Sequence, residues 1–141
     1  MKRDRKKQKG FTLVEIMIVI GIIATLFGLV GPRVMDALRG SKTKIAAIQM
    51  KSYEQALQSY YAEAGFFPNT QQGLQALLSK PTVGRVPNNY PPNGFLSKKT
   101  LEKDPWGSDY RYVCEDYQQF TLTSDGPDLQ SGTEDDIKND E

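Results

Sequence analysis

The chain has 141 residues, of which 38% are hydrophobic and 25% charged, and its formal net charge is +1. It contains no histidine, which removes the most frequent general base, the catalytic triads built on it and most zinc sites. Its single cysteine, Cys114, excludes an intramolecular disulfide, so composition points away from an enzyme and from a disulfide-stabilised domain.

The first ten residues form a basic leader. They carry six of the eighteen basic residues and one of the seventeen acidic ones, which leaves twelve bases and sixteen acids, a net charge of −4, on the rest. Binding of nucleic acid requires a basic face on the folded part, so this distribution argues against it. The positive-inside rule instead predicts that the leader holds the N-terminus in the cytoplasm.

An apolar segment follows from Phe11 to Gly31, and its only charge is Glu15. As an α-helix it would cover about 31 Å, enough to cross the hydrocarbon core of a bilayer. A secretory signal peptide has a shorter apolar core and a small-residue cleavage site after it, and no A-x-A sequence follows here. An uncleaved signal anchor remains an alternative.

The same helix is predicted to continue after the apolar segment. Pro32 predicts a kink or local melting because proline removes a helix hydrogen bond. Apolar residues then recur at three-to-four spacing, and we predict one helix from about residue 12 to about 63, ended by Gly65. The recurring residues are Val34, Leu38, Ile45, Ile48 and Ala56, with Tyr53, Leu57 and Tyr60 on an adjoining face.

After this helix the sequence predicts a short helix and a loop. Asn69 stands at a helix-capping position and Gln72 at the reciprocal one, which indicates a short helix ending before Pro81. Residues 81–94 hold four prolines, two glycines and three asparagines, which predicts a loop.

A turn and a hairpin are predicted next. Residues 104–107, Asp-Pro-Trp-Gly, form a tight-turn sequence. Residues 109–115 and 118–124 alternate in polarity around Glu115-Asp116, which predicts a two-stranded antiparallel hairpin. The fold class is therefore α+β, with one long N-terminal helix and a small C-terminal domain of a short helix, loops and a short antiparallel sheet.

Glu15 is unusual because a carboxylate inside a bilayer costs about 2.5–3.5 kcal/mol even on lenient insertion scales. Cleavage after Gly10 would turn the Phe11 nitrogen into a cationic amine, which a neighbouring subunit could present to Glu15. Alternatively, Glu15 lies one turn from the helix start and simply reaches the interface, where the helix dipole favours its charge. The residues alone leave both interpretations open.

The boundary Gly10-Phe11-Thr12-Leu13-Val14-Glu15 resembles the leader site of type IV pilins and pseudopilins. In that family a membrane-embedded prepilin peptidase cuts before the phenylalanine and then methylates its amine. Most of the remaining chain, including FFPNTQQGLQALL, the Asp-Pro-Trp-Gly turn and the glycine- and aspartate-rich C-terminus, resembles the major pseudopilin family of type II secretion. The final IKNDE lacks the tryptophan expected near that family's C-terminus.

The resemblance implies a structural subunit rather than an enzyme. It would be anchored in the bacterial inner membrane by a single span with its C-terminal domain in the periplasm, and would polymerise into a pseudopilus that pushes exoproteins outward. Expected partners are identical subunits, minor pseudopilins, the prepilin peptidase and an assembly platform with a cytoplasmic ATPase. The implied domains are a removed leader, 1–10; a transmembrane and filament-core helix, 11–31; and a periplasmic domain, 32–141, with an acidic calcium loop and tail, 124–141.

The acidic C-terminus suggests a calcium site. Seven acids and one base follow Ser124, and Ca²⁺ prefers six to eight oxygen ligands on a loop. The resemblance implies side-chain ligands from Asp128, Asp135 and Asp136 and a backbone carbonyl from Asp125. The EF-hand spacing is absent, and a solvated acidic tail is the alternative interpretation.

Two other functions remain as alternatives. One is a type IV pilus or DNA-uptake pilin, although such pilins usually close their C-terminal loop with a disulfide, which one cysteine cannot form. The other is a membrane-tethered enzyme that uses the carboxylate pair Asp135 and Asp136 or the pair Asp109 and Glu115. Neighbouring carboxylates alone are weak support for catalysis, because exposed acidic pairs are common. Cys114 is interpreted as an inert, half-buried residue.

Overall fold

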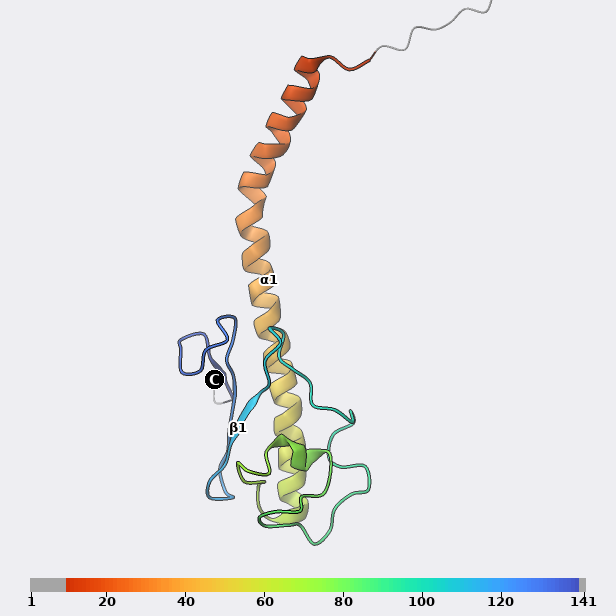
Figure 1. The fold of residues 1–141 in the computed structure, drawn as a ribbon, viewed down its shortest axis with the longest axis vertical. Helices are drawn as coiled ribbons and strands as arrows, with labels where there is room; N and C mark the ends of the chain where they lie inside the picture. The colour runs from red at the N-terminus through yellow and green to blue at the C-terminus, as the bar shows by residue number, and fades with distance from the viewer. Residues whose placement is uncertain (1–9, 140–141) are drawn as a thin grey trace, which may run out of the picture. The chain divides into compact units, whose positions relative to one another are not determined.

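The structure is a computed structural model that describes residues 10–139. The order of elements is α1, a short 3₁₀ helix η1, and strands β1, β2 and β3 (Figure 1). The chain divides after Arg39 into two compact units, which are called the first and the second unit below. The leader predicted for residues 1–10 lies outside the described residues except for Gly10.

Helix α1 runs from Leu13 to Ala64, which confirms the predicted helix of about 12 to 63. It ends at Gly65, which has a φ of +76° and donates its backbone N–H to the Tyr61 carbonyl at 2.7 Å. This left-handed conformation favours glycine at a helix terminus. The prediction at Pro32 was a kink or local melting; the helix continues through this residue, so melting does not occur.

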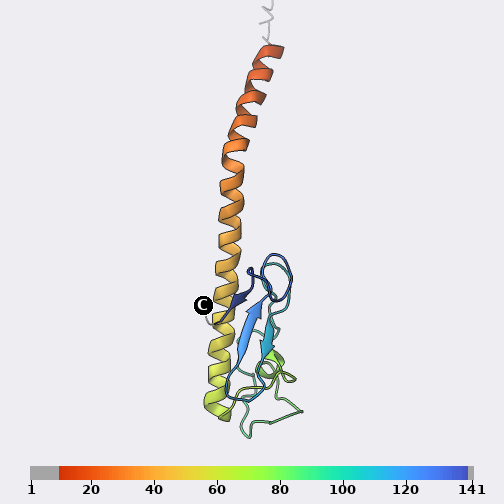
Figure 2. The ribbon, with the colours of Figure 1, turned by 90° about the vertical axis from the view of Figure 1, so that its left-hand side faces the viewer.

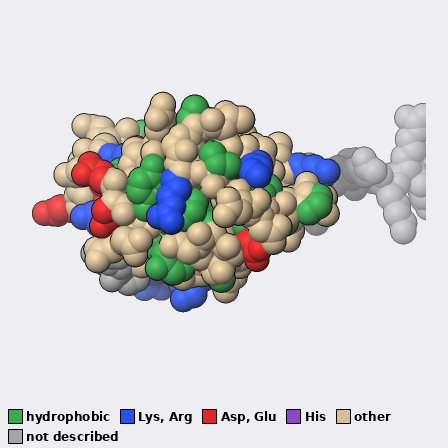
Figure 3. Space-filling model, turned by 90° about the horizontal axis from the view of Figure 1, so that it is seen from below, with side chains coloured by type: hydrophobic (Ala, Val, Ile, Leu, Met, Phe, Trp, Pro, Cys, Tyr) green, Lys and Arg blue, Asp and Glu red, His purple; other side chains and the backbone are tan. Residues whose placement is uncertain are grey.

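The second unit has a core between α1 and the sheet. Tyr60 and Leu57 of α1 are fully buried there, as is Leu122 of the sheet. The core is rich in aromatic residues, which bury a large apolar area in a small domain. Its buried members are Met50, Tyr53, Ala56, Leu57, Tyr60, Phe66, Phe67, Leu74, Ala76, Leu77, Tyr110, Tyr112, Cys114 and Leu122. Figure 3 views the molecule from below, where small hydrophobic groups are interspersed with charged and polar ones.

The sheet has three antiparallel strands in the order β1-β2-β3 (Figure 2). Strand β1, Arg111–Val113, and strand β2, Thr121–Ser124, form the predicted hairpin, with Arg111 opposite Thr123. Strand β3, Ile137–Lys138, was not predicted, and it pairs with the end of β2 so that Ser124 faces Ile137. Two residues are too short for a sequence periodicity, so only pairing with β2 defines β3.

The short helix predicted after Asn69 is η1, Leu74–Leu77, a single 3₁₀ turn. The predicted reciprocal hydrogen bonds are present, because the Gln72 N–H donates to Asn69 Oδ1 at 2.9 Å and the Asn69 N–H donates to Gln72 Oε1 at 2.8 Å. They close the turn before η1 and do not cap η1, whose N-cap is Gly73 without a side-chain hydrogen bond. The Gln72 amide also donates to the Val83 carbonyl at 2.6 Å. This buried side chain therefore fixes both the turn before η1 and the loop predicted at 81–94.

Candidate assembly and metal-binding sites

The start of α1 is closed by a capping box. The Thr12 N–H and hydroxyl donate to Glu15 Oε2 at 2.8 and 2.9 Å, and the Glu15 N–H donates to Thr12 Oγ1 at 3.3 Å. Exchange of this kind satisfies backbone donors that have no partner in the first helical turn. Within one subunit, the carboxylate of Glu15 is thus used by its own helix terminus. This capping role was not predicted above, although Thr-x-x-Glu before an apolar run is its signature.

The two residues on either side of the predicted cleavage bond are exposed. Phe11 keeps 86% of its surface accessible. A Cβ added to Gly10 would meet nothing within 4 Å among residues 10–139. Intramolecular packing therefore does not require glycine at this position, and any requirement for a small residue must come from a binding partner.

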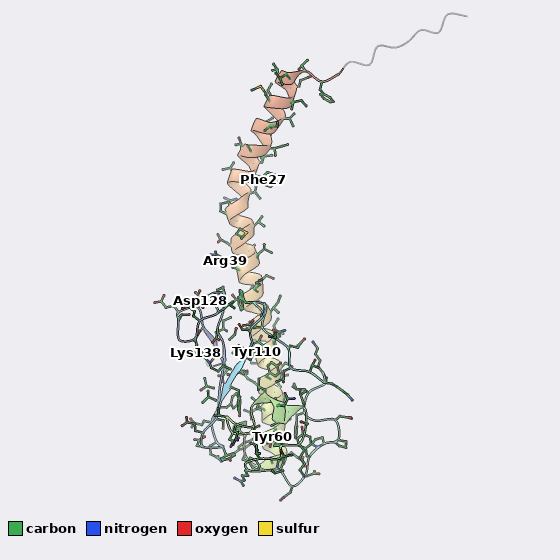
Figure 4. The ribbon with its side chains drawn as sticks, in the orientation of Figure 1. Phe27, Arg39, Tyr60, Tyr110, Asp128 and Lys138 are labelled. Atoms are coloured by element: carbon green, nitrogen blue, oxygen red, sulfur yellow. The ribbon has the colours of Figure 1, made fainter. Side chains whose placement is uncertain are left out.

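The first unit exposes a continuous apolar helix. Every large hydrophobic side chain from Phe11 to Val34 is exposed, including Phe27 at 75% (Figure 4). The helix is long and apolar enough to cross a membrane, and none of its apolar stretch is buried. Exposed apolar surface of this extent requires a lipid or protein environment.

The acidic loop, residues 125–136, is enclosed by the sheet, since it leaves the end of β2 and returns at the start of β3. Arg111 of β1 contacts both ends of this loop. Its Nη2 donates to Asp125 Oδ1 at 2.7 Å and lies 3.4 Å from Asp136 Oδ2. One guanidinium therefore balances the carboxylates of two of the four residues predicted as calcium ligands. The predicted contribution of Asp125 to the ion was its backbone carbonyl, not this carboxylate.

Asp136 is the most buried of those carboxylates, with 3% of its side chain exposed. Its Oδ2 also accepts the Gly132 N–H at 2.9 Å. Its Oδ1 is buried and has no hydrogen-bond partner in the described residues. A buried carboxylate oxygen without a donor is costly, so this atom is a candidate cation ligand.

The other two predicted ligands lie differently. Asp128 is half-buried, and its Oδ1 accepts the Gln130 N–H at 3.0 Å. Asp135 is exposed, while its backbone carbonyl lies so close to Gly126 that a Cβ there would be 2.2 Å away. Across residues 10–139, no three or more acidic or cysteine side chains are gathered closely enough to hold a metal ion. The structure therefore pairs Asp125 with Asp136 but does not assemble all four residues.

A buried link joins the predicted Asp-Pro-Trp-Gly turn to the acidic loop. Asp104, only 4% exposed, accepts the backbone N–H groups of Trp106 and Ser108 through Oδ1 at 3.1 and 2.8 Å. Its Oδ2 accepts the Ser124 hydroxyl at 2.7 Å. Ser124 Oγ in turn accepts the Gly126 N–H at 3.3 Å. The turn was predicted from its residues, whereas this connection was not.

Comparison with known families agrees with the sequence and the fold. Residues 33–140 match the family model described as type II secretion system (T2SS), protein G. The chain belongs to this family. Residues 5–31 also match the prokaryotic N-terminal methylation motif.

Known relatives of this chain carry the same description. It is 42% identical over 134 residues to the type II secretion system core protein G of Pectobacterium carotovorum subsp. carotovorum, covering 94% of this chain and 85% of that protein. It is 41% identical over 138 residues to the type II secretion system core protein G of Escherichia coli (strain K12), covering 97% of this chain and 94% of that protein.

A solved structure supports the fold. The crystal structure of the major pseudopilin from the type 2 secretion system of enterohaemorrhagic Escherichia coli superposes with a TM-score of 0.67 at 36% identity, covering 74% of this chain and 87% of that one. The chain is thus a major pseudopilin of the type II secretion system with a pilin-like α+β fold. The protein G family is structural, which removes the enzyme alternative.

Proposed function

We propose that this pseudopilin is an inner-membrane precursor whose leader, residues 1–10, is removed and whose helix, residues 11–31, then forms the core of a filament. Residues 32–141 would form the periplasmic part, and growth of the filament would push exoproteins outward. The observation that carries this proposal is the exposed apolar start of α1 together with the methylation motif at residues 5–31. Lipid covers this surface before assembly, and identical helices cover it afterwards.

The partners follow from this proposal. Identical subunits and minor pseudopilins would contact the helix, a prepilin peptidase would cut after Gly10 and methylate the Phe11 amine, and an assembly platform with a cytoplasmic ATPase would drive polymerisation. Glu15 would pair with the Phe11 amine of a neighbouring subunit. Within one chain the Glu15 carboxylate accepts hydrogen bonds from the Thr12 N–H and hydroxyl. The amine of a neighbouring subunit would therefore have to share the carboxylate with these groups or displace them.

Processing is tested by the mass of the protein isolated from membranes of a bacterium with a type II system. We expect loss of residues 1–10 and gain of one methyl group. Gly10→Leu should remain uncut, and because a Cβ at this position meets nothing within 4 Å among the described residues, we expect the variant to fold. Normal maturation of Gly10→Leu would contradict the cleavage site, and an intact wild-type N-terminus would indicate an ordinary signal anchor.

We also infer that the acidic loop binds calcium. Two observations support this: the buried Oδ1 of Asp136, which has no hydrogen-bond partner in residues 10–139, and five carboxylates within twelve residues of a loop that the sheet closes at both ends. The donor set is all oxygen, which suits Ca²⁺. When bound, the ion would neutralise part of the loop's negative charge. Asp125, Asp128, Asp135 and Asp136 are its candidate ligands.

Calcium binding is tested by thermal unfolding of the full chain in detergent micelles. An ion that binds only the folded state adds about 2.7 kcal/mol at a hundredfold excess over Kd, which should raise Tm by several degrees. Asp128→Ala should lose most of this rise. Magnesium is the control ion, because its strict octahedral geometry suits such a loop less well. A melting curve that does not respond to calcium would exclude the site and leave the filament function unaffected.

A further inference from the structure

The topology of the sheet brings three charged residues to one end of it. Arg111 begins β1 and faces Thr123 near the end of β2, while Ile137 begins β3 and faces Ser124 at the end of β2. Asp125 directly follows β2 and Asp136 directly precedes β3. The antiparallel pairing therefore places a guanidinium between the first and last carboxylates of the acidic loop.

We propose that Arg111 is a built-in counter-ion of the acidic loop, bound to Asp125 and Asp136, and that it competes with the divalent cation for the carboxylate of Asp136. The proposal rests on the calcium binding inferred above and concerns its regulation. With Arg111 engaged, the loop is closed without metal. With the cation bound, the guanidinium gives up at least part of its contact.

The guanidinium of Arg111 contacts the two carboxylates unequally. Arg111 Nη2 reaches Asp125 Oδ1 at 2.7 Å, which is a short charge-assisted hydrogen bond. The same nitrogen lies 3.4 Å from Asp136 Oδ2, a longer and weaker contact. Arg111 and Asp125 are only partly exposed, with 38% and 23% of their side chains accessible, so water screens this pair less than a surface pair.

Asp136 is where competition arises. Its Oδ2 is occupied by the Gly132 N–H and the guanidinium, whereas its buried Oδ1 has no hydrogen-bond partner in residues 10–139. A cation bound at Oδ1 would share one carboxylate with Arg111. Two positive groups on the same carboxylate repel each other, so binding of one weakens binding of the other.

Arg111 thus sets the affinity of the loop for its cation. Without it, two carboxylates at the end of the sheet would repel each other until metal arrived, and the loop would depend on calcium for order. With Arg111 in place, the loop keeps its conformation when calcium is removed, but it binds calcium more weakly. The ion can then exchange without unfolding of the sheet.

The test compares three full-length chains in detergent micelles: wild type, Arg111→Gln and Lys138→Gln. Calcium binding is measured by isothermal titration calorimetry and by the fluorescence of Trp106, the single tryptophan. Arg111→Gln should bind calcium about tenfold more tightly, because a neighbouring positive charge is removed, and its Tm in a chelator should fall below that of wild type. Lys138→Gln removes the same charge from an exposed position on β3 and should change affinity by less than about twofold (Figure 4).

The possible outcomes are distinct. Unchanged or weaker calcium binding by Arg111→Gln would overturn the proposal, because Arg111 would then be only a structural support. If Arg111→Gln unfolds in chelator, recovery of the wild-type Trp106 fluorescence on adding calcium supports the proposal, and failure to recover overturns it. A wild type that binds no calcium would overturn the calcium inference itself, and competition with it. If wild type binds calcium and Arg111→Gln binds it with the same affinity, only the proposed role of Arg111 is overturned.

Discussion

Ser124 donates its hydroxyl to Asp104 across twenty residues, and this 2.7 Å hydrogen bond is buried. Asp104 belongs to the turn before β1, whereas Ser124 is the last residue of β2 and the residue before the acidic loop. The turn and the loop are therefore held in register by one carboxylate. Asp104 accepts three hydrogen bonds in this arrangement, and Ser124 Oγ accepts a fourth from the Gly126 N–H.

Asp104→Asn should destabilise the second unit by about 2 kcal/mol, because an amide replaces an oxygen that accepts a buried hydroxyl. Tm should fall by roughly 5–10 °C. Thermal unfolding of the full chain in micelles, followed by Trp106 fluorescence, measures this change. Asp109→Asn is the matched control, because Asp109 is 83% exposed and pairs only with the exposed Lys103 among the described residues. Equal melting of both variants would contradict a structural role for the Asp104–Ser124 bond.

Removal of two buried tyrosine hydroxyls should change the stability of the protein differently. The Tyr60 hydroxyl is buried and has no partner in the described residues, so Tyr60→Phe should leave stability unchanged or raise it by up to about 1 kcal/mol. The Tyr112 hydroxyl donates to the Pro68 carbonyl at 2.7 Å, so Tyr112→Phe should cost about 1–2 kcal/mol. Urea unfolding midpoints compare the two variants. A larger loss for Tyr60→Phe than for Tyr112→Phe would show that the Tyr60 hydroxyl has a partner in solution.

The second unit should unfold in alkali. Burial raises the pKa of Tyr60 from 10.0 to about 12, and burial also raises the pKa of Tyr112. Below pH 10 the folded and unfolded states both keep these protons, so the stability is complete. Between pH 10 and about 12 the unfolded chain releases a proton that folded Tyr60 retains, and stability falls as the pH rises.

Circular dichroism and phenolate absorbance, recorded together during an alkaline titration, measure this transition. We expect the buried tyrosines to ionise only as the core unfolds, and Tyr60→Phe to weaken the pH dependence. Ionisation of every tyrosine while the fold persists would contradict the linkage.

Glu15 and Thr12 allow charge to be separated from capping. Glu15→Gln keeps an oxygen for the capping box but removes the charge, whereas Thr12→Ala removes the cap and keeps the charge. If Glu15 pairs with a neighbour's Phe11 amine, Glu15→Gln should be cut normally but add poorly to filaments, and Thr12→Ala should assemble. Sedimentation of filaments from cells that co-express wild type measures incorporation, after mass spectrometry confirms processing. Equal assembly of the two variants would favour the interpretation that Glu15 only serves its own helix terminus.

The sequence by itself determined the long helix, because its apolar periodicity is sustained over many turns and Gly65 supplies the left-handed residue that ends it. Local chemistry also determined the reciprocal Asn69–Gln72 hydrogen bonds and the β1–β2 hairpin, since each involves residues close together in the chain. The residues around Gly10 and Phe11 showed a resemblance to type IV pilins and pseudopilins, and FFPNTQQGLQALL, the Asp-Pro-Trp-Gly turn and the glycine- and aspartate-rich C-terminus narrowed it to the major pseudopilin family.

Only the tertiary structure decided the contacts at the end of the sheet. Strand β3 has two residues and no periodicity, and it exists because the end of β2 offers unpaired backbone groups. Arg111 meets Asp136 across twenty-five residues, and Asp104 meets Ser124 across twenty. Sequence spacing cannot reveal such pairs, because the register of three short strands, rather than any local preference of the residues, brings their side chains together.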